Sequence, residues 1–218
     1  MDRLIHSDNV ATATKKRSYH HGDLRQALLA ATVDLIAAED IAAVSLRAIA
    51  RRVGVTPAAP YHHFKDKNDL LAAVGREGFG RLRAELDRAS ADAGEDPRSR
   101  MRAIGIGYVG FAVANPAHYR VMFGCARKDE DEFPQLHAAG QSCFDRLIAA
   151  AVAMLGDKAT ESEVRRVAVT CWSACHGLAT LYNDGPLGTK FEGVGLEVLL
   201  NQMLEMLLSG IEASANGA

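Results

Sequence analysis

The chain has 218 residues, with 25 Lys and Arg against 27 Asp and Glu, and a formal net charge of −2. Its 48% hydrophobic and 24% charged residues exclude a disordered or fibrous chain. The longest purely apolar run, residues 147–155, is far shorter than the ~20 residues of a membrane-spanning helix, so we expect no membrane segment. Four cysteines and no leader pattern favour a cytoplasmic protein without a disulfide framework. The slightly acidic total by itself argues against a nucleic-acid binder.

The charge is distributed unevenly along the chain. Residues 15–67 carry nine Lys and Arg against five Asp and Glu, a net charge of +4, and four of the eight histidines. Residues 68–218 carry a net charge of −5. Such asymmetry indicates two regions with different tasks, although solvated charged faces are common.

The first 14 residues show no hydrophobic period and are expected to form a mobile tail. A helical period follows, and Asp23 with Gln26 predicts a capping box at its start. Ser45 predicts the start of a helix over 46–53, which Gly54 ends. Thr56 and Pro57 predict the start of another, short helix. Pro60 removes the first backbone bond of that helix, at a small cost so near its end. A longer helix is expected from Asp66 to about Ala91.

Helical stripes continue beyond a polar, turn-forming stretch at 94–97. They break at Asn115-Pro116 and again in a charged loop at 127–132, and further helices are expected over 134–155, 161–183 and 193–212. The sequence predicts an all-α protein of about nine helices. Its expected parts are a flexible basic arm (1–21), a helix-turn-helix head (22–82) and a second helical domain (95–213).

The run "SLRAIARRVGVTPAAPYHHF", residues 45–64, has the pattern of a helix-turn-helix. The small side chains of Thr56, Ala58 and Ala59 would let the backbone approach base edges. The run also carries donors for phosphate oxygens, and Lys67 adds another. The pattern alone leaves open the alternative of two ordinary packed helices joined by a loop.

The segments "IARRVGVT", "YHHF" and "KDKNDLL" resemble the DNA-binding domain of the tetracycline-repressor (TetR-type) family of bacterial transcriptional regulators, in register from Gly22 to about Leu82. In that family an aliphatic residue usually precedes the tyrosine, where this chain has Pro60. The arm "KKRSYHHGD", with Lys16 and Arg17, is either a DNA-tracking tail or a solvated terminus. The resemblance implies these DNA contacts, with phosphate-binding positions at the tyrosine and the lysine: Arg47, Thr56, Pro57, Ala58, Ala59, Tyr61, His62, His63 and Lys67.

Farther along, Trp172 lies four residues before His176-Gly177, and "HYRVMFG" covers 118–124. These features resemble a subgroup of the same family with a Trp…His-Gly regulatory domain, which implies ligand sensing and dimerisation and names no ligand. Cys171 and Cys175 with His176 suggest either a metal site or a redox switch. We do not favour the metal site because no second pair completes a tetrahedral set, and we expect no metal and no cofactor; a redox role of the two cysteines stays open. Taken singly, each of the residues that can line an apolar pocket is more simply interpreted as ordinary core. These residues are Tyr108, Phe111, Met122, Phe123, Trp172 and His176.

The last expected helix is apolar nearly all round and predicts a homodimer interface. We therefore expect a dimeric transcriptional repressor that binds a pseudo-palindromic operator in double-stranded DNA and is released by a small-molecule effector. An enzyme built on Cys175 and His176 is an alternative, but adjacent helical residues point apart. A non-specific architectural DNA binder is another. The residues assigned to the dimer interface are Leu196, Leu199, Leu200, Met203 and Leu207.

Overall fold

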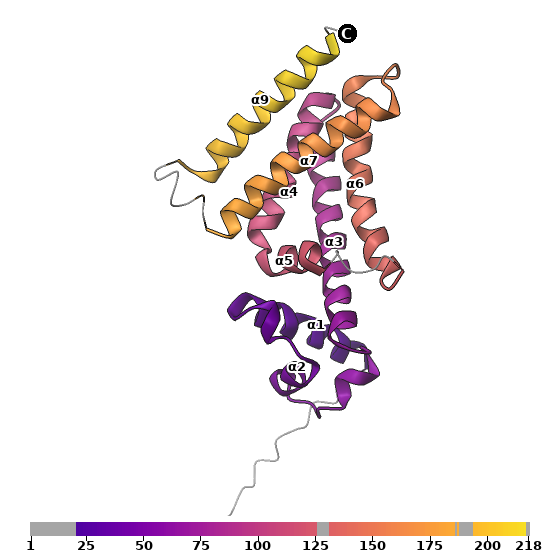
Figure 1. The fold of residues 1–218 in the computed structure, drawn as a ribbon, viewed down its shortest axis with the longest axis vertical. Coiled ribbons are helices and arrows are strands. Elements are labelled where there is room, and N and C mark those ends of the chain that lie inside the picture. Colours follow the sequence, from indigo (N-terminus) through magenta and orange to yellow (C-terminus); the bar gives the residue numbers. More distant parts are fainter. Residues whose placement is uncertain (1–20, 126–130, 186, 188–193, 217–218) are drawn as a thin grey trace, which may run out of the picture.

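The computed structural model describes residues 21–125, 131–185, 187 and 194–216. Within these ranges the chain is all-helical and has no strand, as the sequence predicts. A small head lies at one end of the molecule and an antiparallel helical bundle fills the rest (Figure 1). The elements are α1 (His21–Ala38), η1 (Ile41–Ala43), α2 (Leu46–Val53), η2 (Ala59–His62), α3 (Lys67–Asp92), α4 (Pro97–Ala114), α5 (Pro116–Cys125), α6 (Pro134–Leu155), α7 (Glu161–Asn183) and α9 (Leu196–Asn216), where η marks a 3₁₀-helix.

Local capping signals determine several helix ends. The Ser45 hydroxyl accepts a hydrogen bond from the backbone N–H of Ala48 at 3.1 Å and starts α2. Gly54 ends that helix in the left-handed conformation, with φ of 78°. Asp66 accepts from the N–H of Asp69 at 2.9 Å at the start of α3. These ends agree with the predicted ones because each depends on residues within one turn of the helix.

Two predicted helix starts are wrong. Helix α1 already includes His21, so Asp23 lies inside it rather than at its start. A capping residue favours a start by only about 1 kcal/mol and does not stop a helix from extending upstream. At Thr56 no α-helix begins: Pro60 has no N–H for the first i→i−4 bond, and the N–H of Tyr61 instead bonds the Ala58 carbonyl at 3.1 Å. The predicted short helix is therefore a turn followed by the four-residue η2.

Two hydrophobic cores share the long helix α3. The head core includes Leu70 and Val74 of α3, and the bundle core includes Phe79 and Leu82 one to two turns later. Helix α5 also contributes to both cores. The head and the bundle are thus joined by two helices, and α3 runs through both parts (Figure 1).

Helix α6 is the one helix in the described ranges whose length and apolar composition would suffice to cross a membrane. It packs against α3, α4 and α7 of the bundle. Helix α9 is attached to α4 by Arg98, whose guanidinium donates to the Glu205 carboxylate at 2.7 Å and also pairs with Glu212. These contacts place α6, α7 and α9 around the cavity described below.

Candidate DNA interface and ligand cavity

The buried face of α2 determines which of its side chains reach solvent. Leu46, Ile49 and Ala50 are buried in the head. Because neighbouring positions on a helix point in different directions, Arg47 and Arg51 are directed outward, and both are exposed. Arg52 is exposed as well.

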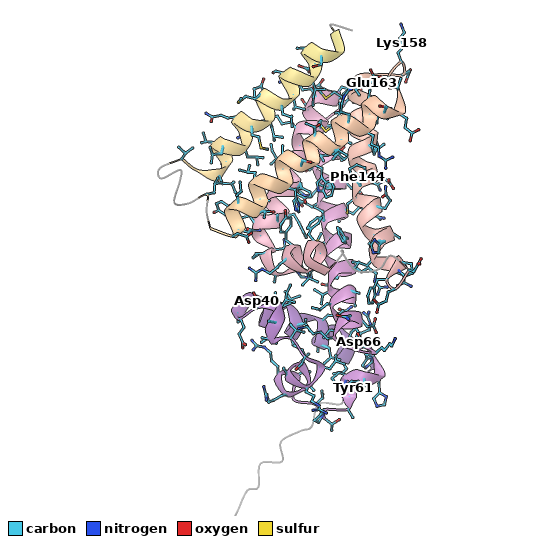
Figure 2. The ribbon with its side chains drawn as sticks, in the orientation of Figure 1. Asp40, Tyr61, Asp66, Phe144, Lys158 and Glu163 are labelled. Atoms are coloured by element: carbon cyan, nitrogen blue, oxygen red, sulfur yellow. The ribbon has the colours of Figure 1, made fainter. Side chains whose placement is uncertain are left out.

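The turn after α2 and the following η2 present most of the remaining predicted DNA contacts. Thr56, Pro57, Ala58 and His62 are exposed, and Ala59 and His63 are half-buried. The Tyr61 side chain is 53% exposed and lies at the tip of the head (Figure 2). Pro60, which replaces the usual aliphatic residue, is buried and anchors this turn against the head. The structure thus brings the predicted contact residues onto one end of the molecule.

Lys67 lies differently from the other predicted contacts. Its ammonium donates to the backbone carbonyl of Ile41 at 2.7 Å and to that of Ala42 at 3.4 Å. At least one of its three N–H groups is thus directed to η1 within the head. The predicted phosphate contact by Lys67 remains untested.

Four basic side chains of the head have no partner among the described residues. No described residue forms an ion pair or hydrogen bond with the side chains of Arg47, Arg51, Arg52 or Lys65. In the bundle, acidic partners pair with Arg81, Arg88, Arg98 and Arg146. Arg120 and Lys158 of the bundle have no ion pair with a described residue. The candidate list from sequence omits Arg51, Arg52 and Lys65, although the two arginines occupy the last turn of the predicted helix. Lys16, Arg17 and most of the expected loop at 127–132 lie outside the described residues.

A cavity of about 470 Å³ lies within the bundle, which is a size suited to a small organic molecule. Three of the six predicted pocket residues, Tyr108, Phe123 and Trp172, form part of its wall. Phe111 and Met122 are buried in the same core but do not line it. Figure 2 places Phe144, one of the wall residues that the sequence did not indicate, between α6 and α7. The wall also includes Phe79, Leu82, Leu86, Met101, Ile104, Leu136, His137, Gln141, Cys143, Leu147, Arg165, Val169, Cys171, Cys175 and Leu204.

His176, the sixth predicted pocket residue, lies behind the wall in a hydrogen-bond network. Its Nδ1 lies 2.8 Å from the Tyr108 hydroxyl and 2.7 Å from the Tyr119 hydroxyl. The indole N–H of Trp172 donates to the Tyr108 hydroxyl at 3.3 Å. Burial lowers the pKa of His176, which favours the neutral ring. The Tyr119 hydroxyl also lies 3.3 Å from the Thr180 hydroxyl. The sequence does not indicate either residue as part of this network, because the two come from different helices.

Three free cysteines, Cys143, Cys171 and Cys175, contribute to the cavity wall and are buried. Burial raises the pKa of Cys171 to about 11 and that of Cys175 to about 12. Both groups are therefore thiols near neutral pH, whereas a nucleophile or metal ligand needs the thiolate. Among the described residues no group of three His, Cys, Asp or Glu side chains is arranged to hold a metal ion.

The apolar residues of α9 divide between two faces. Leu200 is buried, and Leu196, Met203 and Leu207 pack against the core of their own chain. Leu199 is half-buried. Most of the predicted interface residues thus lie toward the bundle. The exposed large apolar side chains here are Val198 and Met206 on α9, with Val169, Trp172, Leu181 and Tyr182 on α7.

Two family models match the chain in the order expected from the sequence. Residues 28–74 match the model described as "Bacterial regulatory proteins, tetR family". Residues 101–207 match "Tetracyclin repressor-like, C-terminal domain". The two matches cover the head and the bundle respectively. They do not distinguish the Trp…His-Gly subgroup, which stays a prediction.

Individual proteins agree with these matches. The HTH-type transcriptional regulator BetI of Stenotrophomonas maltophilia is 32% identical over 126 residues, which cover 56% of this chain and 64% of that protein. The chain thus matches just under two thirds of this relative. A solved protein of unknown function from Rhodococcus sp. RHA1 has a TM-score of 0.77 and 30% identity, covering 89% of this chain and 98% of that one. A putative transcriptional regulator from Pseudomonas aeruginosa PAO1 shares the fold, with a TM-score of 0.71, 18% identity and coverage of 91% and 94%.

Proposed function

The chain belongs to the tetracycline-repressor (TetR) family of bacterial regulatory proteins, and we propose that it is a cytoplasmic DNA-binding transcriptional regulator that acts as a repressor. Its head binds double-stranded operator DNA, and its bundle binds a small-molecule effector that releases the DNA. It is not an enzyme, and the buried thiols beside His176 support this part of the proposal.

The observation that carries DNA binding is the unpaired positive charge on the exposed end of the head. Arg47, Arg51, Arg52 and Lys65 have no acidic partner among the described residues. Duplex DNA supplies phosphate oxygens in place of these missing partners. Tyr61 at the same tip adds a hydroxyl donor. The exposed Thr56 and Ala58 are small enough to let the backbone approach base edges.

A homodimer would bring two heads to two half-sites of a pseudo-palindromic operator. The exposed apolar side chains of α7 and α9 support this arrangement, because such side chains are most stable when a partner covers them. We assign the dimer contact to Val198 and Met206 of α9 with Leu181 of α7, in place of the inward-facing leucines of α9.

The two shared helices provide a route for effector release. Phe123 of α5 lines the cavity, while Ala117 and Val121 of the same helix belong to the head core. A ligand that contacts Phe123 therefore acts on a helix that also supports the head. Release requires that the ligand bind more tightly to the arrangement in which the two heads no longer match the half-sites.

Anisotropy of a fluorescent random-sequence duplex, titrated with the full chain at several salt concentrations, tests the DNA-binding part. We expect binding at low salt that weakens as salt increases, because counterions are released when cations meet phosphates. Absence of binding at low salt would contradict the proposal.

A further inference from the structure

The polar groups of the cavity wall favour one kind of ligand. No acidic side chain is among the described wall residues, and Arg165 is the one Lys or Arg there. A cation would therefore enter a largely apolar site without a countercharge, at a high desolvation cost. In contrast, two wall residues, Tyr108 and Trp172, hold a hydroxyl and an indole N–H 3.3 Å apart. Because the indole N–H donates to the Tyr108 oxygen, the Tyr108 O–H is the donor of this pair that suits a ligand with a hydrogen-bond acceptor.

Two hydroxyl groups compete for one nitrogen beside that pair. The Nδ1 of His176 lies 2.8 Å from the Tyr108 hydroxyl and 2.7 Å from the Tyr119 hydroxyl. In the neutral tautomer with the proton on Nε2, Nδ1 has one lone pair and accepts one strong hydrogen bond. Tyr119 has other acceptors, since the Thr180 hydroxyl and the His176 carbonyl both lie 3.3 Å from its oxygen. The Tyr108 hydroxyl contacts the side chains of His176, Trp172 and Tyr119.

We propose that the effector is a mainly apolar, non-cationic molecule with a hydrogen-bond acceptor such as a carbonyl oxygen, and that the Tyr108 hydroxyl donates to this acceptor. In doing so Tyr108 gives up its hydrogen bond to Nδ1 of His176, which then accepts from Tyr119. When Tyr108 donates to the ligand, the lone pair of His176 becomes available to Tyr119. This inference rests on the proposed effector function of the cavity, and adds the chemical class of the ligand and the residues that sense it.

The change of hydrogen-bond donor to His176, from Tyr108 to Tyr119, affects the head because of where Tyr119 lies. Tyr119 lies on α5 in the bundle core, and Ala117 and Val121 of the same ten-residue helix lie in the head core. A stronger bond between Tyr119 and His176 ties α5 to α7. Ligand binding is thus coupled to the helix that supports the head.

Trp172 makes the first test direct, because it is the single tryptophan of the chain and lines the cavity. The probes are 4-phenylcyclohexanone and phenylcyclohexane, which share a skeleton and differ by the ketone oxygen. Dissociation constants are measured from the Trp172 fluorescence of the wild type, of Tyr108→Phe and of the control Tyr182→Phe, whose ring is exposed on the same helix as Trp172.

We expect the wild type and Tyr182→Phe to bind the ketone about three- to tenfold more tightly than the hydrocarbon, the range for one neutral hydrogen bond. Tyr108→Phe should bind both probes alike. Equal binding of the probes to the wild type, or a preference that survives in Tyr108→Phe, would overturn the inference. If Tyr108→Phe fails to fold, the comparison of ketone and hydrocarbon binding by the wild type still tests the inference. If neither probe binds, the effector role of the cavity fails with it, whereas DNA binding by the head is measured independently.

The second test addresses the transfer from Tyr108 to α5. Amide hydrogen exchange of α5 is measured with and without each probe in the wild type and in Tyr119→Phe. The ketone should increase protection of α5 in the wild type, and the hydrocarbon should not. Tyr119→Phe should keep its preference for the ketone in the fluorescence assay but lose the change in α5. An unchanged response of α5 in Tyr119→Phe would overturn the assignment of Tyr119.

Discussion

The ammonium of Lys67 donates to the backbone carbonyl of Ile41 at 2.7 Å, so a side chain expected at the DNA also holds the head together. The bond joins the first residue of α3 to η1. It gives the Ile41 carbonyl, which already accepts from the N–H of Val44 at 3.2 Å, a second and charged donor.

Replacing Lys67 with methionine should therefore destabilise the head. Lys67→Met keeps the aliphatic stem and removes the donor, and we expect a loss of about 1–2 kcal/mol in the free energy of unfolding, measured by urea denaturation. Lys65→Met is the matched control, because Lys65 is exposed and its side chain has no partner among the described residues. Equal stabilities of the two variants would show that the Lys67 bond contributes nothing.

The unpaired arginines of α2 should determine the salt dependence of DNA binding. Removing one phosphate contact with Arg47→Ala or Arg51→Ala should weaken binding to all sequences and reduce the slope of log K against log salt by about 1. Lys158→Ala is the control, because Lys158 lies at the end of the bundle far from the head (Figure 2). A slope that is unchanged in both arginine variants would place the phosphates elsewhere.

Two glycines without close neighbours should respond in opposite directions to alanine. A Cβ atom at Gly54 or at Gly80 would meet no other atom within 4 Å, so neither substitution creates a clash. Gly54 has φ of 78°, and Gly54→Ala should cost about 1–2 kcal/mol of stability because an L-residue is strained there. Gly80 lies within α3, and Gly80→Ala should stabilise by up to about 1 kcal/mol. Chemical denaturation measures both, and a stabilised Gly54→Ala would contradict the left-handed turn.

His118 should make the protein sensitive to mild acid. Burial lowers its pKa and the Arg81 charge adds to this, while Glu77 opposes it, with an oxygen 3.6 Å from Nε2. The folded state therefore binds this proton less readily than the unfolded chain does. The resulting stability is present above the unfolded pKa, about 6.5, and is lost as the pH falls through the folded value.

Replacing His118 with asparagine should reduce this acid sensitivity. The free energy of unfolding is measured for the wild type and for His118→Asn on both sides of the unfolded pKa. We expect a smaller loss on acidification in the variant. An identical loss in both proteins would mean that His118 does not contribute to it.

A structural feature of this chain can be predicted from the sequence when the residues that determine it are close together along the chain. The ends at Ser45, Gly54 and Asp66 are predictable because one turn of chain determines them. The α-helix expected after Thr56 is not, because the missing N–H of Pro60 shifts the balance toward the 3₁₀ form. The sequence of α9 is apolar nearly all round, so it does not predict which face of the helix packs against the core of its own chain and which face is exposed. The hydrogen bond between Tyr119 and His176 joins residues that are 57 positions apart in the sequence, and no local pattern indicates it.

Selection of duplexes bound by the full chain from a random-sequence pool tests the central claim most directly. A dimeric repressor of this fold should enrich one pseudo-palindrome, with half-sites one helical turn of about 34–36 Å apart or a multiple of that spacing. Enriched sequences without two-fold symmetry, or no enrichment over the starting pool, would contradict the claim and favour non-specific binding to the DNA backbone.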